Sequence, residues 1–96
     1  MDLNEFQKII ERTYFSRDSK RGVSGTFMWF AEEVGELASA IREGKREEMK
    51  KEFADVLAWL CSIASLSGIE MNDVVSKYEK GCPLCGRMPC ECPENF

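Results

Sequence analysis

Apolar residues recur along this chain at the three- and four-residue spacing of α-helices, and the pattern predicts an all-α fold. A first helix is expected over about residues 2–16, with Asp2 or Asn4 as its N-cap. The segment 16–25 is rich in serine, glycine and charge, which predicts a loop. Its basic residues could meet a phosphate or simply be solvated; they are Arg17, Lys20 and Arg21.

The second expected helix begins near Ser24 or Thr26 and ends near Gly44. Its apolar side chains fall on one arc of about 120°, which is typical of an amphipathic helix. These side chains are Phe27, Phe30, Ala31, Val34, Leu37, Ala38 and Ile41. Glu33 borders this arc and Glu36 lies beside it. Within this helix alone, a charged solvent face explains both carboxylates as well as a functional site does.

The third expected helix runs from about residue 45 to about Ser67 and is apolar on nearly all sides from Phe53 onward. Such a helix must be covered by other helices or by another subunit. An ionised Asp55 on it needs a partner, and no basic residue lies within a turn of it after Lys51.

After a stop at Gly68, a fourth helix is expected from Asn72 or Asp73 to about Lys80. Lys77 and Lys80 lie at its C-terminal end. Stabilisation of the helix dipole explains these lysines about as well as contact with a substrate does.

Two carboxylate pairs share a three-residue spacing, which places both members of each pair on one helix face: Glu33/Glu36 and Glu52/Asp55. The pairs are equally distant from Gly44 along the chain. If the chain turns there into an antiparallel helical hairpin, both pairs lie roughly 12–17 Å from the turn. Four converging carboxylates repel one another strongly unless cations fill the site. The spacing therefore predicts a metal centre.

Composition narrows the chemistry. The 96 residues include no histidine, which excludes imidazole bases and histidine-ligated zinc, so a metal must be held by oxygen or sulfur. The net charge of −4 argues against a nucleic-acid binder. A charged N-terminal stretch and the lack of a long apolar run predict no signal peptide and no membrane partner, hence a cytoplasmic protein.

Residues 81–96 differ in character from the helical domain expected over residues 1–80. They contain all three prolines of the chain and four cysteines within eleven residues. Cys-Pro-Leu-Cys-Gly is the turn chemistry of a metal knuckle, so a structural zinc site is one interpretation. Paired disulfides and a disordered reduced tail are the others. The four cysteines are Cys82, Cys85, Cys90 and Cys92, whereas Cys61 is expected to fill the core.

The middle of the chain resembles the MazG family of all-α nucleoside triphosphate pyrophosphohydrolases. The resemblance rests on EEVGE at residues 32–36 and EFAD at residues 52–55, and it covers roughly residues 3–80. Neighbouring segments that also resemble the family are RDSKRG, GELASAI, REGKREE, ADVLAWL and SGIE. The resemblance implies a four-helix fold with a central antiparallel hairpin, completed by assembly into a homodimer or homotetramer.

The resemblance further implies that magnesium, or alternatively manganese, is held by Glu33, Glu36, Glu52 and Asp55, with Glu32 as a ligand or a supporting partner. The implied reaction is hydrolysis of (d)NTPs to (d)NMPs and pyrophosphate, with Glu33 or Glu36 positioning the water. The role that the resemblance suggests is the clearing of non-standard nucleotides. Phosphate contacts would come from basic residues, and two tryptophans could stack on the base or pack in the core. These candidate substrate-binding residues are Arg17, Arg21, Trp29, Trp59, Lys77 and Lys80.

Two alternatives remain open from the sequence. A phosphoribosyl-ATP pyrophosphohydrolase would share the same carboxylate chemistry. A non-catalytic helical interaction protein would instead use its four-cysteine knuckle to bind a partner.

Overall fold

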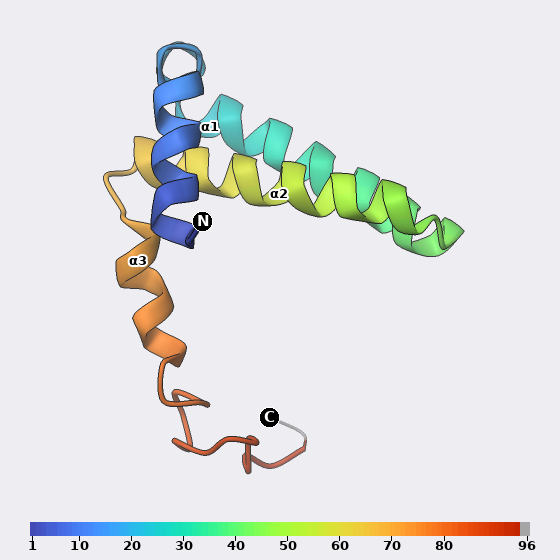
Figure 1. Ribbon diagram of the computed structural model, residues 1–96, viewed down its shortest axis with the longest axis vertical. Helices are drawn as coiled ribbons and strands as arrows, with labels where there is room; N and C mark the ends of the chain where they lie inside the picture. The colour runs from blue at the N-terminus through green and yellow to red at the C-terminus, as the bar shows by residue number, and fades with distance from the viewer. Residues whose placement is uncertain (95–96) are drawn as a thin grey trace.

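The computed structural model describes residues 1–94 and is built from helices (Figure 1). In chain order they are α1 (Leu3–Glu43), α2 (Arg46–Leu66), α3 (Met71–Val74) and the 3-10 helix η1 (Val75–Tyr78). No strand occurs within residues 1–94. The predicted all-α fold is confirmed.

Helix α1 consists of two halves that run in different directions, the first drawn in blue and the second in cyan to green in Figure 1. Asp2 caps the first half as predicted, because its Oδ1 accepts from the backbone N–H of Glu5 at 2.8 Å. The helical geometry breaks at Gly22, whose φ of 78° and ψ of 172° are accessible essentially only to glycine. The chain therefore changes direction over a single residue.

The prediction of a loop over residues 16–25 is wrong. Side chains of this segment bond within the helix: the Ser19 hydroxyl donates to the Phe15 carbonyl, and Arg21 donates to the Asp18 carboxylate at 3.0 Å. These bonds support helix in a segment whose composition favours turns. The break lies at Gly22 and not at Ser24 or Thr26, which were expected to start the next helix.

The second half of α1 and helix α2 form the central antiparallel hairpin that the sequence predicted, and they lie side by side in Figure 1. Gly44 ends α1 with a left-handed φ of 69°. Its N–H donates to the carbonyls of Ala40 and Ile41 at 3.0 and 3.1 Å, so it closes the helix and reverses the chain.

The first half of α1 crosses the C-terminal end of α2, and the core lies at this crossing. Its buried members are Ile10, Cys61, Ala64 and Met71. Cys61 is fully buried, which agrees with its predicted role as core filling.

Gln7 connects three elements at this crossing. Its side-chain amide donates to Ser65 Oγ at 3.1 Å and to the Ile69 carbonyl at 2.9 Å. Its Oε1 accepts from the backbone N–H of Met71 at 2.8 Å. A side chain distant in sequence thus satisfies the start of α3, whose N-cap residue Glu70 makes no side-chain capping bond.

The last helix is shorter than predicted. Helix α2 stops at Leu66, just before Gly68, as expected, but α3 has only four residues and tightens into η1, which ends at Tyr78. The Ser76 hydroxyl donates to the Asp73 carbonyl at 2.7 Å, a local bond that competes with continued α-helix. Lys80 therefore lies beyond the helix.

Apolar side chains along the hairpin remain uncovered in the single chain. On α1 they belong to the predicted apolar arc, where Phe27 is 51% exposed and Ile41 53%. On α2, Phe53 is 57% exposed. Assembly into an oligomer, which would cover such faces, stays a prediction.

No single helix among residues 1–94 has both the length and the hydropathy of a membrane span. One sharply bent pair, α2 with α3–η1, meets the criterion by length and composition only.

Candidate metal centre

Three carboxylates meet between the two helices of the hairpin. Glu33 and Glu36 project from successive turns of α1, and Glu52 projects from α2. Each contributes an oxygen, and these oxygens all lie within 4.8 Å of one another. Glu52 is buried, Glu33 is half-buried and Glu36 is exposed, so the group opens toward solvent on one side. The geometry brings together three of the four residues in the two predicted pairs.

The cluster lacks a protein partner for its charge. The Oε2 atoms of Glu33 and Glu52 are both buried and find no hydrogen bond among the described residues. Within residues 1–94, no lysine or arginine forms an ion pair with Glu33, Glu36 or Glu52. Buried carboxylate oxygens without donors carry a large desolvation cost. Carboxylate oxygens are the ligands that Mg²⁺ and Mn²⁺ prefer, so these three residues fit such an ion.

Crowding of negative charge changes the proton affinity of the cluster. Burial, then the adjoining Glu52 carboxyl and the charges of Glu36 and Asp55, raise the pKa of Glu33 from 4.5 to about 7. A proton can therefore partly neutralise the cluster near neutral pH when no cation is bound. A divalent ion would do so more completely.

Asp55 and Glu32 occupy different positions from the three clustered glutamates. Asp55 is near enough to raise the pKa of Glu33, yet it lies outside the group of oxygens within 4.8 Å. It lines an adjoining cavity instead. Glu32 is exposed and also lies outside the group. The role of either residue as a metal ligand stays a prediction.

A cavity of about 290 Å³ lies between the first half of α1 and helix α2. Four of its lining residues were candidate site residues from the sequence: Arg17, Arg21, Asp55 and Trp59. The Arg21 guanidinium lies 5.1 Å from the centre of the Trp59 ring, within cation–π range. Trp29 stacks on Trp59, with the two ring centres 6.2 Å apart and the planes 12° apart. The cavity thus offers an aromatic wall, two cations and two carboxylates, those of Asp18 and Asp55.

Asp18 holds Arg21 in this position, and sequence reasoning missed it. Asp18 is only 3% exposed and accepts from the Arg21 guanidinium at 3.0 Å. The same guanidinium nitrogen lies 3.5 Å from the hydroxyl of the fully buried Thr26. The available signal was the three-residue spacing of Asp18 and Arg21, which pairs side chains only if the segment is helical. Tyr14 and Ser62 also line the cavity and were not predicted.

A second cavity, of about 310 Å³, opens on the other side of the carboxylates. It is lined by Glu36 and Glu52 together with Ser39, Ala40, Glu43, Lys45 and Glu48. Lys45 is its basic residue, and that side chain pairs with Glu43 at 3.5 Å. The carboxylate cluster can therefore be reached from the turn end of the hairpin.

The remaining sequence candidates lie elsewhere. Lys77 and Lys80 are exposed and line neither of the two cavities. The Lys77 ammonium lies 5.6 Å from the centre of the Tyr78 ring. The single chain does not bring these lysines to the carboxylates. The four tail cysteines gather into a separate group.

Comparison with known families adds an independent finding. The family model described as the MazG nucleotide pyrophosphohydrolase domain matches residues 22–85, about two thirds of the 96 residues. The matched region begins at the break in α1 and contains the whole hairpin with its carboxylates. No curated protein sequence matches the chain. Both the match and the all-helical hairpin support a pyrophosphohydrolase type of function, and the protein belongs to the MazG nucleotide pyrophosphohydrolase family.

Proposed function

We propose that this protein is a Mg²⁺-dependent pyrophosphohydrolase that converts (d)NTPs to (d)NMPs and pyrophosphate. The observation that carries the proposal is the group of three carboxylates within 4.8 Å, two of which have a buried oxygen without a partner. A divalent ion held there supplies positive charge for phosphate oxygens and acidifies a water for attack at the α-phosphorus. The family match supports the same class of reaction.

We assign a role to each carboxylate according to its exposure. Glu33 and Glu52, with their buried free oxygens, are assigned as ligands of the ion. Glu36 is exposed on the cavity side, so it can both bind the ion and orient a water. Asp55, which lines the neighbouring cavity, is assigned as the fourth ligand. Glu32 is assigned only a hydrogen bond to the waters that Mg²⁺ usually retains.

The cavity beside Asp55 suits the rest of the substrate. Its volume of about 290 Å³ is near the lower end of the range for small-ligand sites. Trp59 offers an aromatic face for a base, and Arg17 and Arg21 offer charge for the phosphates. The exposed Lys77 and Lys80 can reach a phosphate only if a second copy of the chain places them near the hairpin.

We also propose that the chain works as a homodimer or homotetramer. The exposed apolar side chains on the hairpin, including Phe27 and Phe53, support a helical interface with a second copy. Light scattering coupled to gel filtration tests this assembly. Phe53→Lys should shift the protein toward the monomer, and a wild-type monomer at micromolar concentration would contradict the proposal.

The activity is tested with a nucleotide panel in the presence of Mg²⁺, Mn²⁺ or EDTA, with separate detection of pyrophosphate and orthophosphate. The panel should contain standard and base-modified (d)NTPs and phosphoribosyl-ATP. We expect pyrophosphate as the first product, with no turnover in EDTA. Preferential turnover of base-modified nucleotides would support a role in clearing non-standard substrates. Orthophosphate as the first product would place the attack at the γ-phosphorus and refute the proposed reaction.

Matched variants locate the activity. Glu52→Gln keeps the shape of the side chain and removes one buried charge, so turnover should fall by about 10²–10³-fold, as for loss of one preorganised electrostatic group. Glu11→Gln makes the same change at an exposed position of α1 and should leave turnover unchanged. Equal rates for the two variants would show that the hairpin carboxylates are not the catalytic centre.

A further inference from the structure

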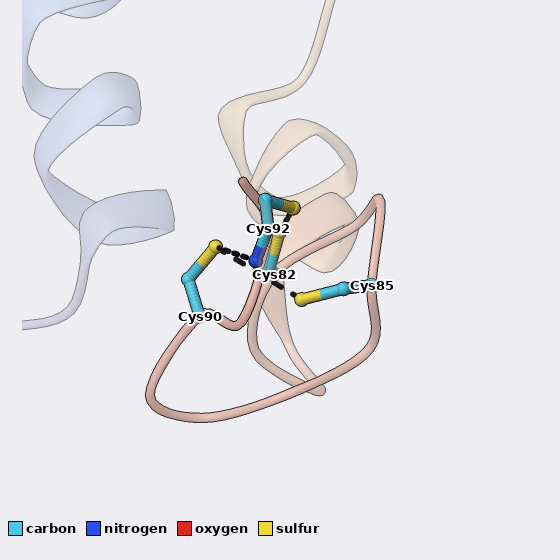
Figure 2. A group of neighbouring side chains, drawn as sticks. All are labelled: Cys82, Cys85, Cys90 and Cys92. Carbon is cyan, nitrogen blue, oxygen red and sulfur yellow. Dashed lines mark hydrogen bonds between the residues drawn. The ribbon is translucent and has the colours of Figure 1, made fainter. Parts of the chain in front are cut away.

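The chain after η1 forms a compact structure of its own. In Figure 1 it leaves α3 and η1 and lies away from the turn of the hairpin. Four thiol groups point toward one another there, as Figure 2 shows for Cys82, Cys85, Cys90 and Cys92. Neither the carboxylate centre nor the proposed reaction uses these residues.

The spacing of the sulfurs is that of a site for one ion. The Sγ atoms of Cys82 and Cys92 are 3.7 Å apart, those of Cys85 and Cys90 are 3.9 Å apart, and all four lie within 4.8 Å. Zn–S bonds of about 2.3 Å at tetrahedral angles require sulfurs about 3.8 Å apart. An iron–sulfur cluster places several atoms between its thiolates and needs a wider cage. All four thiols are free and none is in a disulfide.

The backbone is folded to present the sulfurs. The N–H of Gly86 donates to the Cys82 carbonyl at 2.7 Å, and the N–H of Cys82 donates to the Arg87 carbonyl at 3.0 Å. Gly86 adopts a left-handed φ of 70°, which closes this turn after Cys85.

Two further amides donate to the sulfurs themselves. The N–H of Glu91 lies 3.3 Å from Cys85 Sγ, and that of Cys92 lies 3.3 Å from Cys90 Sγ. Amide donors of this kind stabilise metal-bound thiolates and orient them.

Other interactions in the tail are too weak to hold this shape. Leu84 and Met88 are 64% and 76% exposed, so the described part of the tail, residues 81–94, has no apolar core. Its one described ion pair, Arg87 with Glu91 at 3.7 Å, is exposed, and such pairs contribute little. A segment this short normally needs a metal or covalent links to fold.

We propose that Cys82, Cys85, Cys90 and Cys92 bind one Zn²⁺ through four thiolates, and that this ion folds the tail independently of the carboxylate centre. Four protein sulfurs fill the coordination shell and leave no open position, so the site is structural. The two metal centres of the chain then have different chemistry. The hairpin site offers only oxygen, and the tail site offers only sulfur.

The test uses the full chain purified without chelator from cells grown with zinc. Zinc content is measured by mass spectrometry before and after a thiol-modifying mercurial, and Co²⁺ is substituted for the metal. We expect one zinc per chain, its release on thiol modification, and the intense thiolate-to-cobalt absorption of a tetrahedral site. Deuterium exchange in the tail should become faster when zinc is removed, while exchange in α2 is unchanged.

Variants separate the tail from other sites. Changing the four tail cysteines to serine should abolish zinc binding and leave Mg²⁺-dependent turnover within about twofold. Cys61→Ala, which removes the cysteine outside the tail, should retain the zinc. Zinc that persists in the four-serine variant, an iron chromophore, or tail disulfides in the purified protein would overturn the proposal. Because turnover and zinc content are measured separately, failure of one proposal does not decide the other.

Discussion

Replacing Glu33 by glutamine should stabilise the metal-free protein. The change keeps the side-chain volume and removes one charge from a cluster that pairs with no basic residue of the described part of the chain. Most substitutions of a native residue at a half-buried position destabilise a protein. A gain in stability would therefore identify a side chain that is retained for a ligand and not for folding.

The magnitude follows from the proton affinity of the site. The pKa of Glu33 is raised from 4.5 to about 7, and the difference corresponds to about 3 kcal/mol for the ionised form above pH 8. Because Glu33 is partly exposed, solvent screening reduces this upper bound, and about 1–3 kcal/mol is expected. For a domain of this size, each 1 kcal/mol shifts Tm by about 4–8 °C.

Thermal unfolding at pH 8 provides the assay, with and without divalent ions. In EDTA, Glu33→Gln should melt at least about 4 °C above the wild type. With Mg²⁺ at 100 times its Kd, the wild type should gain about 2.7 kcal/mol, which raises Tm by about 10 °C or more. The variant should show little of this gain, so the wild type should have the higher Tm in Mg²⁺ and the variant the higher Tm in EDTA.

The control is Glu11→Gln, the same change on the exposed surface of α1. It should melt with the wild type in both buffers. If Glu33→Gln instead lowers Tm in EDTA, and the wild type does not respond to Mg²⁺ or Mn²⁺, the carboxylates are not a strained cation site and the reasoning fails.

Three other expectations are open to measurement. The folded-state pKa of Glu33 lies above its unfolded value, so its contribution to stability is fully present below about pH 4.5 and is lost as pH rises to about 7. Urea unfolding of the metal-free protein should show this fall in the free energy of unfolding across that range. A flat pH profile would contradict the expectation. Gly22→Ala should destabilise the protein by about 1–3 kcal/mol because of the φ of 78° at Gly22, although a Cβ there meets no atom within 4 Å. Gly35→Ala, the same change at a helical position of α1, should stabilise the protein by about 0.5–1 kcal/mol. Equal effects of the two changes in thermal melts would exclude backbone strain at Gly22. Asp18→Asn weakens the ion pair that positions Arg21 above Trp59. Steady-state kinetics should then show that KM for the nucleotide rises about fivefold while kcat changes little. An unchanged KM would mean that Arg21 does not bind the substrate.

The hairpin could be predicted because its signals are local and symmetric. Helical spacing places Glu33 beside Glu36, and Gly44 lies midway between these glutamates and the pair on α2. Once the turn is placed, the rise of the helix fixes which residues face each other. The structure agrees for Glu33, Glu36 and Glu52. Asp55 lies outside this group and lines the neighbouring cavity, although it is as far from Gly44 along the chain as Glu33 is.

Other features depend on contacts that local patterns do not contain. Gln7 bonds to residues 58 to 64 positions away, and nothing in its neighbourhood marks it as the cap of α3. The composition of residues 16–25 indicated a loop, whereas the structure has helix on both sides of a break at Gly22. The pair of Asp18 and Arg21 becomes visible only after that segment is recognised as helix. Composition indicated where the chain changes direction but not over how many residues.

The carboxylate centre and the exposed apolar faces belong to the same hairpin, so we expect metal binding and assembly to be linked. The core of one chain is small, with Ile10 and Met71 among its few buried apolar side chains, so it offers little to offset two buried carboxylate oxygens without donors. A second copy that covers Phe27 and Phe53 would hold the two helices at a fixed separation, and with them the distance between Glu33 and Glu52. An ion that binds the clustered oxygens favours that same separation. The two events bias one arrangement of the hairpin, so each should strengthen the other by the same factor.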